Sequence, residues 1–313
     1  MSIAAVGTLS LACESFSSPA TSGTTLPRNV IVPLSAVSRF FPEITRETST
    51  GRNLMATGNP KSTRMVIYET GDGSWAPPPS EPFGAAAGRA PHDLRVAVVT
   101  NPPIDVPLDP ARTDAVHEAG RLLEALGHHV EEAEAPWRDD TLLTAFTALF
   151  APLVMLQVAL GRIVNGREPT QEEMEPISWT LWELVGGMSA LDAHLATARL
   201  QIFARGLLSW MAQYDVIVAP SLAEAPVLLD EVDWRTDDPM GLFERSAAFT
   251  PYTAVANVTG QPAMSIPLAE HDGLPVGVQL FGRPAGEGEL LSLATALEAA
   301  QPWAQRQPQL AMG

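Results

Sequence analysis

The chain has 313 residues, of which 46% are apolar and 18% are charged, so it can bury the core of one large or two ordinary domains. Its 19 basic and 36 acidic residues give a net charge of −17, which disfavours nucleic acid and anionic membrane surfaces as partners. A single cysteine, Cys13, excludes an intrachain disulfide and a metal site made of several thiolates. A reducing, cytoplasmic location is the expectation.

Residues 1–74 differ in composition from the rest of the chain. They are rich in serine and threonine and carry 6 basic and 5 acidic residues, so the acidic excess lies after Gly73. Turn-forming residues recur too often for long helices or strands, and residues 75–79 read as a stiff connector. We predict a poorly ordered leader over residues 1–74 and a folded domain over residues 75–313. No basic residue precedes the first apolar run, so a secretory signal is not expected.

A strand–helix–strand unit is predicted after residue 94. Residues 94–100 form an apolar run, Asp109 and Pro110 are a helix cap and first-turn proline, and Gly127 ends the helix. The next strand is expected over residues 128–134, which indicates a parallel or mixed sheet. Four residues of the helix are expected to face inward: Val116, Ala119, Leu123 and Leu126.

The pair His128 and His129 invites a metal-site interpretation. Adjacent residues of a strand point to opposite faces of the sheet, so their imidazoles diverge. We therefore expect no metal site here, and the sequence contains no other ligand cluster.

Two helical stretches are predicted next, over residues 140–164 and about 171–213. Residues 141–161 are uncharged and long enough to span a bilayer. Pro152 and Gln157 interrupt this run and charged residues crowd its ends, so a buried core helix or pocket wall is favoured over a membrane span. Four apolar residues of the second stretch share one helix face: Leu191, Leu195, Ala198 and Ile202.

Residues 249–282 are expected to form a short helix followed by a buried hairpin. A strand over residues 216–219 precedes this segment. Gly260 can adopt a positive φ, and Pro262 cannot donate to a ladder, so a strand begins only after it. Asp272 and Gly273 form the reversal between the two hairpin strands. A final helix is expected over residues 287–300, with four residues facing inward: Leu290, Leu293, Leu297 and Ala300.

Gln279 is a lone polar residue on the glycine-lined side of the second hairpin strand. One interpretation is an ordinary strand residue that faces the surface. The other is that Gly277 and Gly282 allow a ligand or another backbone to approach closely.

These residues resemble the amidase signature hydrolases. The resemblance covers about residues 75–310 and is most specific in FTPYTAVANVTGQPAMSIPL and the following GLPVGVQLFGRPAGEGELLSLATALEAAQPWAQRQP, with support from LRVAVVTNPP and YDVIVAPSLAEAP. The chain is more similar to the actinobacterial amidases related to aminohexanoate cyclic dimer hydrolase than to the amidotransferase subunit. The resemblance implies an α/β fold, with a mixed sheet covered by helices on both faces, and hydrolysis of a small-molecule amide without a cofactor.

The resemblance also implies a Ser, cis-Ser, Lys triad with a glycine- and serine-rich loop, on the amino-terminal side of the matched region. The only lysine of the chain, Lys61, lies in an unrelated context, and the only Gly-Gly pair, Gly186-Gly187, lies in a predicted helix. The fold is therefore expected to lack the amino-terminal catalytic part, and no catalytic residue is nominated. Lys61 with Ser62 is a weak substitute pair, because adjacent residues rarely converge.

Two hypotheses remain from the sequence. The chain is either an amide hydrolase whose matched portion supplies the substrate pocket, or an inactive truncated or frame-disrupted amidase or pseudoenzyme that acts as a binding module. A homodimer is compatible with both. The positions nominated near a substrate are Phe249, Thr250, Asn257 and Gln279.

Overall fold

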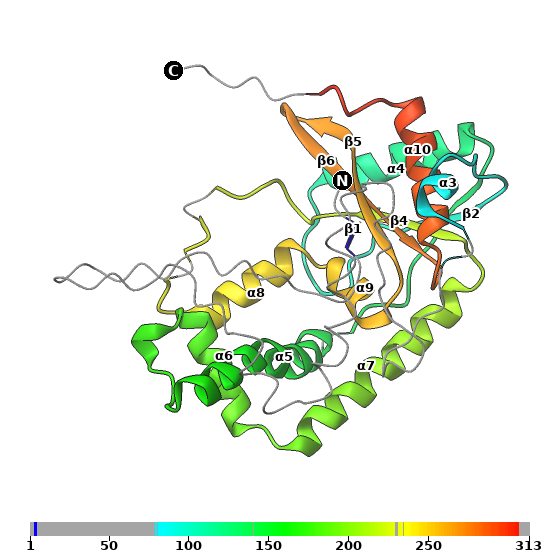
Figure 1. Cartoon of the computed structure of the whole chain (residues 1–313). Coiled ribbons are helices and arrows are strands. Elements are labelled where there is room, and N and C mark those ends of the chain that lie inside the picture. Colours follow the sequence, from blue (N-terminus) through cyan, green and yellow to red (C-terminus); the bar gives the residue numbers. More distant parts are fainter. Residues whose placement is uncertain are drawn as a thin grey trace, which may run out of the picture. The chain divides into compact units, whose positions relative to one another are not determined.

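The computed structural model of the chain describes residues 3–4, 79, 81–139, 141–228, 231–233 and 235–306 (Figure 1). Nearly all of the predicted leader, including Cys13 and Lys61, lies outside these residues, so its proposed disorder stays a prediction. Ile3–Ala4 form a short strand, β1. The remaining elements belong to the part of the chain that follows Pro79.

A mixed sheet organises this part of the chain. Its order is β1, β5 (Ala263–His271), β6 (Leu274–Gly282), β4 (Val216–Pro220), β2 (Arg95–Val98) and β3 (His129–Glu132). The neighbours β4, β2 and β3 are parallel, whereas β1, β5, β6 and β4 pair in antiparallel fashion. The predicted mixed sheet is confirmed.

Alternating residues of the strands point to opposite faces of the sheet, and each face packs in a separate hydrophobic core. On one face, Val96 and Val98 pack with α4 (Pro110–Ala125) and α10 (Glu287–Ala300). On the other, Ala97 and Phe281 pack with α7 (Ala190–Met211) and α9 (Thr253–Thr259). Figure 1 shows these helices on opposite sides of the strands, with α3 (Phe83–Ala87) beside α10. Helices on both faces are thus confirmed.

Helix α4 begins and ends as its capping residues predict. Asp109 accepts a hydrogen bond from the Ala111 amide at 3.0 Å, Pro110 is the first helical residue, and Gly127 has a φ of +91°. Three of the four expected inward residues are fully buried, but Leu126 is 38% exposed, so its assignment was wrong. It is the C-cap residue, where the helical periodicity no longer fixes the side-chain direction.

The two adjacent histidines diverge as expected. His128 is buried, and its Nδ1 accepts from the Leu94 amide at 3.3 Å, whereas His129 is exposed on β3. Burial lowers the pKa of His128. No group of three metal-ligating side chains occurs among the described residues.

The helical middle of the chain consists of α5 (Leu142–Asn165), η1 (Gln171–Glu173), α6 (Pro176–Gly187) and α7. The helical stretch predicted over about residues 171–213 therefore consists of three separate elements, η1, α6 and α7. Ser189 is the N-cap residue of α7. Among the described residues, α5 alone is long and apolar enough to cross a membrane, on length and composition. Only 29% of its most apolar window is buried, and Leu142, Leu143 and Phe146 of α5 line a pocket, so of the two expected alternatives the pocket wall describes α5 better than the buried core helix.

The segment after residue 238 contains α8 (Pro239–Phe249), α9 and the β5–β6 hairpin. Gly260 has a φ of +70° as the C-cap of α9, and β5 begins directly after Pro262. Asp272 and Gly273 both adopt positive φ, as a tight two-residue hairpin turn requires. The pairing shifts between Ile266 and Ala269, where Pro267 offers no amide hydrogen to the ladder.

Helix α10 covers the hairpin from the side of α4. Leu290, Leu293 and Leu297 are buried as predicted. Ala300 is exposed, which corrects the fourth expected position, because it is the last residue of the helix, where the helical periodicity no longer fixes the side-chain direction.

Candidate active site

An apolar pocket lies between α5, α8 and α9. Its volume is about 150 Å³, and it is lined by side chains of all three helices together with Ile104 from the loop before α4. An apolar cavity of this size accommodates a group about as large as benzene. None of its lining residues carries a charge.

Aromatic rings form one wall of this apolar pocket. Phe146 of α5 stacks on Phe150 with ring centroids 5.5 Å apart, and Phe150 stacks on Phe243 of α8 at 6.4 Å. Phe146 and Phe243 both line the pocket. The stack therefore fixes the spacing of α5 and α8, and it presents flat apolar surfaces to an occupant.

The polar groups that line the pocket come from the end of α8, the α8–α9 connection and α9. The hydroxyl of Thr250 donates to the Ser246 carbonyl at 2.9 Å, and that of Thr253 donates to the Thr250 carbonyl at 2.9 Å. Their hydrogens are thus committed to the backbone. Asn257 is exposed, and its carboxamide makes no hydrogen bond to another described residue. It brings both a donor and an acceptor to the pocket.

The structure brings together two of the four nominated positions. Thr250 and Asn257 both line the apolar pocket. Phe249 ends α8 and does not line the pocket; its carbonyl accepts from the Ala223 amide at 3.1 Å. Gln279 lies in β6 and is only 6% exposed, so it does not face the surface.

The two glycines near Gln279 do allow close approach, but to side chains of this chain. A Cβ on Gly277 would lie 2.8 Å from Ser221 Oγ and 3.1 Å from Ser265 Oγ. A Cβ on Gly282 would lie 3.0 Å from Leu290 Cγ. Neither glycine therefore requires a ligand to explain it.

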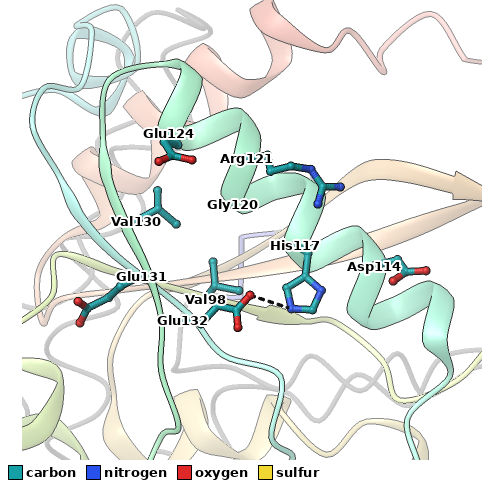
Figure 2. A pocket seen from close by; sticks show the side chains of 9 residues that line it. All are labelled: Val98, Asp114, His117, Gly120, Arg121, Glu124, Val130, Glu131 and Glu132. Atoms are coloured by element: carbon teal, nitrogen blue, oxygen red, sulfur yellow. Dashed lines mark ion pairs between the residues drawn. The ribbon is translucent and has the colours of Figure 1, made fainter.

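A larger groove lies between α4 and β3 and is strongly acidic. Its volume is about 610 Å³. Figure 2 shows His117 pointing toward Glu132, with Nε2 and Oε1 3.6 Å apart, whereas Glu131 points away. Glu131 instead accepts a hydrogen bond from the Tyr214 hydroxyl. The remaining charged side chains of this acidic groove are Asp114, Arg121 and Glu124.

The acidic groove is the weaker candidate although it is larger. The Glu132 side chain is 80% exposed and that of Arg121 is 66% exposed, so water screens their charges. The groove contains no serine, threonine or cysteine that could act as a nucleophile. The apolar pocket, with a few polar groups in its lining, has the usual character of a small-molecule site.

Comparison with known proteins decides the family. The family model described as Amidase matches residues 62–291 of the chain. The chain belongs to the amidase family.

Named relatives and solved structures agree with the amidase assignment. The 6-aminohexanoate-cyclic-dimer hydrolase of Pseudomonas sp. (strain NK87) is 30% identical over 255 residues, 78% of this chain and 51% of the relative. A protein named putative amidase AmiC, of Mycobacterium tuberculosis (strain ATCC 25618 / H37Rv), is 32% identical over 243 residues, 76% of this chain and 50% of the relative. The structure of 6-aminohexanoate cyclic dimer hydrolase complexed with substrate has a TM-score of 0.69 and 26% identity, and the match covers 77% of this chain and 52% of that one.

These matches confirm the resemblance that the sequence motifs indicated, and with it the α/β fold class. A bacterial aryl acylamidase of the amidase signature family shares the fold, with a TM-score of 0.58 at 19% identity, over 71% of this chain and 46% of that one. The chain spans about half the length of the curated relatives it matches. The activity of those whole proteins therefore enters below as a proposal.

Sequence reasoning missed the aromatic wall of the apolar pocket. Phe146 and Phe150 stand one helical turn apart, a spacing that predicts contact within α5. Phe243 lies almost a hundred positions later, on α8. No local pattern signals that α5 and α8 face each other, so only the fold could reveal this wall.

Proposed function

We propose that this amidase contributes the substrate pocket for hydrolysis of a carboxamide C–N bond, with the apolar group of the amide held between α5 and α8. The observation that supports this proposal most strongly is the apolar pocket, which has a wall of stacked aromatic rings and the exposed carboxamide of Asn257 among its lining groups. Membership of the amidase family supports the reaction class.

The pocket matches the two parts of such a substrate. Its volume of about 150 Å³ suits a phenyl ring or a short alkyl segment. The uncharged lining favours a neutral substrate over a carboxylate or an amine, because a buried charge without a partner is strongly destabilised. Asn257 can donate to the amide oxygen and accept from the amide nitrogen of the same substrate.

The nucleophile and its base are not assigned. A serine hydroxyl needs a proton acceptor and oxyanion donors to attack an amide, and the apolar pocket supplies uncharged side chains only. Lys61, the sole lysine, lies outside the described residues. Because no nucleophile and base are assigned, a second candidate function remains, in which a truncated or divergent amidase binds amides without hydrolysing them.

Benzamide separates the two candidates. Purified full-length protein is incubated with benzamide and with a cyclic amide dimer at several pH values, and released ammonia or amine is measured alongside equilibrium binding. Binding with release above the buffer background supports the hydrolase. Saturable binding with background release supports the binding module. No binding of either amide contradicts both.

A small-molecule amide as the ligand and a cytoplasmic location also stay proposals. The first rests on the apolar pocket and the family. The second rests on the single cysteine. Fractionation of the native host with an antibody against the chain would test the location.

A further inference from the structure

The apolar stripe of α7, defined as Leu191, Leu195, Ala198 and Ile202, is exposed. The three large side chains Leu191, Leu195 and Ile202 are 66%, 59% and 64% exposed, and Ala198 is exposed as well. Helix α7 lies at the periphery of the helical part in Figure 1. Scattered surface leucines are ordinary, but four apolar residues on one helix face form a continuous patch.

The spacing of this stripe is that of a coiled-coil seam. Its members follow one another at intervals of four, three and four residues, which is a/d spacing over slightly less than two heptads, and Arg205 occupies the next d position. Helix α7 has 22 residues, and its opposite face is anchored by the buried residues Leu200, Leu207 and Met211. The exposed seam is therefore held on a rigid, preformed helix and loses little conformational entropy when it is covered.

We propose that α7 is the interface of a homodimer, in which the apolar stripes of two copies pack against each other with the helices antiparallel. A two-fold axis between Leu195 and Ala198 then stacks Leu195 on Ala198 of the second copy, and Leu191 on Ile202 of the second copy. Both pairings recur by symmetry, as an isologous interface requires.

The charges that flank the stripe select this arrangement. Asp192 and Arg199 both lie on the same flank, at e positions, and e positions face each other in antiparallel helix pairs. Each Arg199 then lies beside Asp192 of the second copy, which gives two opposite-charge pairs. A parallel pairing would place Arg199 beside His194 of the second copy instead, without an attractive partner.

Arg199 and Asp192 have contacts within their own chain, but these contacts still allow each residue to pair with the second copy. The Arg199 side chain is 54% exposed, and its nearest carboxylate, Asp139, is 3.9 Å away. Asp192 caps α7 by accepting from the Ser189 amide at 2.9 Å, which holds its carboxylate at the helix start. Its pKa is lowered, mainly because the Ser189 hydroxyl donates to it.

The mass of the full-length chain in solution is the first test. Light scattering with size exclusion is expected to give twice the monomer mass of 33.4 kDa at micromolar concentration. Leu195→Asp and, separately, Arg199→Glu should shift the protein to monomer, Leu195→Asp by at least about 100-fold in dissociation constant, because it buries two like charges in the seam. Leu228→Asp is the matched control: Leu228 is 66% exposed but lies outside α7, and its variant should stay dimeric.

Cross-linking tests the antiparallel order. In a Cys13→Ser background, chains with Leu191→Cys are mixed with chains with Ile202→Cys and oxidised mildly. The antiparallel pair brings these positions together and gives a disulfide-linked heterodimer, whereas a parallel pair leaves them about 16 Å apart, beyond disulfide reach. The proposal is overturned if the wild-type chain is still monomeric at a concentration of about 100 µM. It is also overturned if a folded Leu195→Asp variant remains dimeric. Cross-linking of Leu191→Cys chains alone, without the mixed product, overturns the antiparallel order.

Discussion

The hydroxyl oxygens of Ser221 and Ser265 lie 2.6 Å apart, on opposite sides of strand β6. Ser221 directly follows β4 and is buried, whereas Ser265 belongs to β5 and is exposed. The two side chains can meet because the residue of β6 between them is Gly277, which has no side chain. The pair therefore links the two strands that flank β6.

Substitution of Gly277 by alanine should destabilise the chain. The new Cβ would lie 2.8 Å from Ser221 Oγ and 3.0 Å from Ser221 Cβ, so the serine pair must separate. Overpacking of this kind costs about 1–3 kcal/mol of unfolding free energy, to be measured by urea denaturation. The control is Gly206→Ala in α7, where a Cβ meets no atom within 4 Å and helix propensity improves. Equal or greater stability of Gly277→Ala would show that the pair does not constrain the sheet.

Removal of the α4 cap should also lower stability. Asp109 accepts from the Ala111 amide, and its other oxygen lies 3.3 Å from Nε of Arg112, whose side chain is 2% exposed. Asp109→Ala should therefore lower the unfolding free energy by about 1–3 kcal/mol at pH 7. Asp109→Asn keeps a capping oxygen and should lose less. Equal losses for the two variants would contradict a capping role.

The Asp109 effect should depend on pH. The Ala111 amide hydrogen bond is the largest cause of the lowered pKa of this carboxyl group. A lowered pKa in the folded state stabilises above the unfolded value of about 4, and this contribution disappears as the pH falls through the folded value. The difference between wild type and Asp109→Ala should stay constant near neutral pH and shrink below about pH 4. A difference that grows on acidification would contradict this assignment.

The Tyr214 hydroxyl should make the stability of the fold depend on pH in alkaline solution. Burial, and then the hydrogen bond to Glu131, raise its pKa to about 12. A raised pKa favours the neutral phenol in the folded state, so its contribution is complete below about pH 10 and is lost as the pH rises toward 12. Between these values the wild-type chain should lose stability faster than Tyr214→Phe, which keeps the ring but cannot ionise. Parallel pH profiles for the two proteins would contradict the shift.

Local chemistry made much of the fold predictable. Three structural features follow from the backbone preferences of a few residues, and all three occur where expected. They are the start of α4 at Asp109 and Pro110, the end of α9 and start of β5 at Gly260 and Pro262, and the hairpin turn at Asp272 and Gly273. Two predicted inward positions at helix ends, Leu126 and Ala300, are exposed, because at the end of a helix the periodicity no longer fixes the side-chain direction.

Tertiary arrangement could not be read from the sequence. The spacing of Leu195 and Ile202 shows that they share a face but not whether that face is covered, and both are exposed. Thr250 and Asn257 line the apolar pocket because α8 and α9 lie across α5, an arrangement set by contacts far apart in the chain. Local periodicity carries no information about such contacts.

Titration of the isotope-labelled full-length chain with benzamide, followed by NMR, tests the amide pocket most directly. The Asn257 side-chain amide signal is assigned from its absence in Asn257→Asp, a variant of the same shape. The predicted result is saturable shifts of Asn257 and Thr250 signals, with binding about tenfold weaker in Asn257→Asp because one amide hydrogen bond is lost. Shifts confined to the acidic groove around His117, or equal affinity of the two proteins, would contradict the assignment of the substrate site.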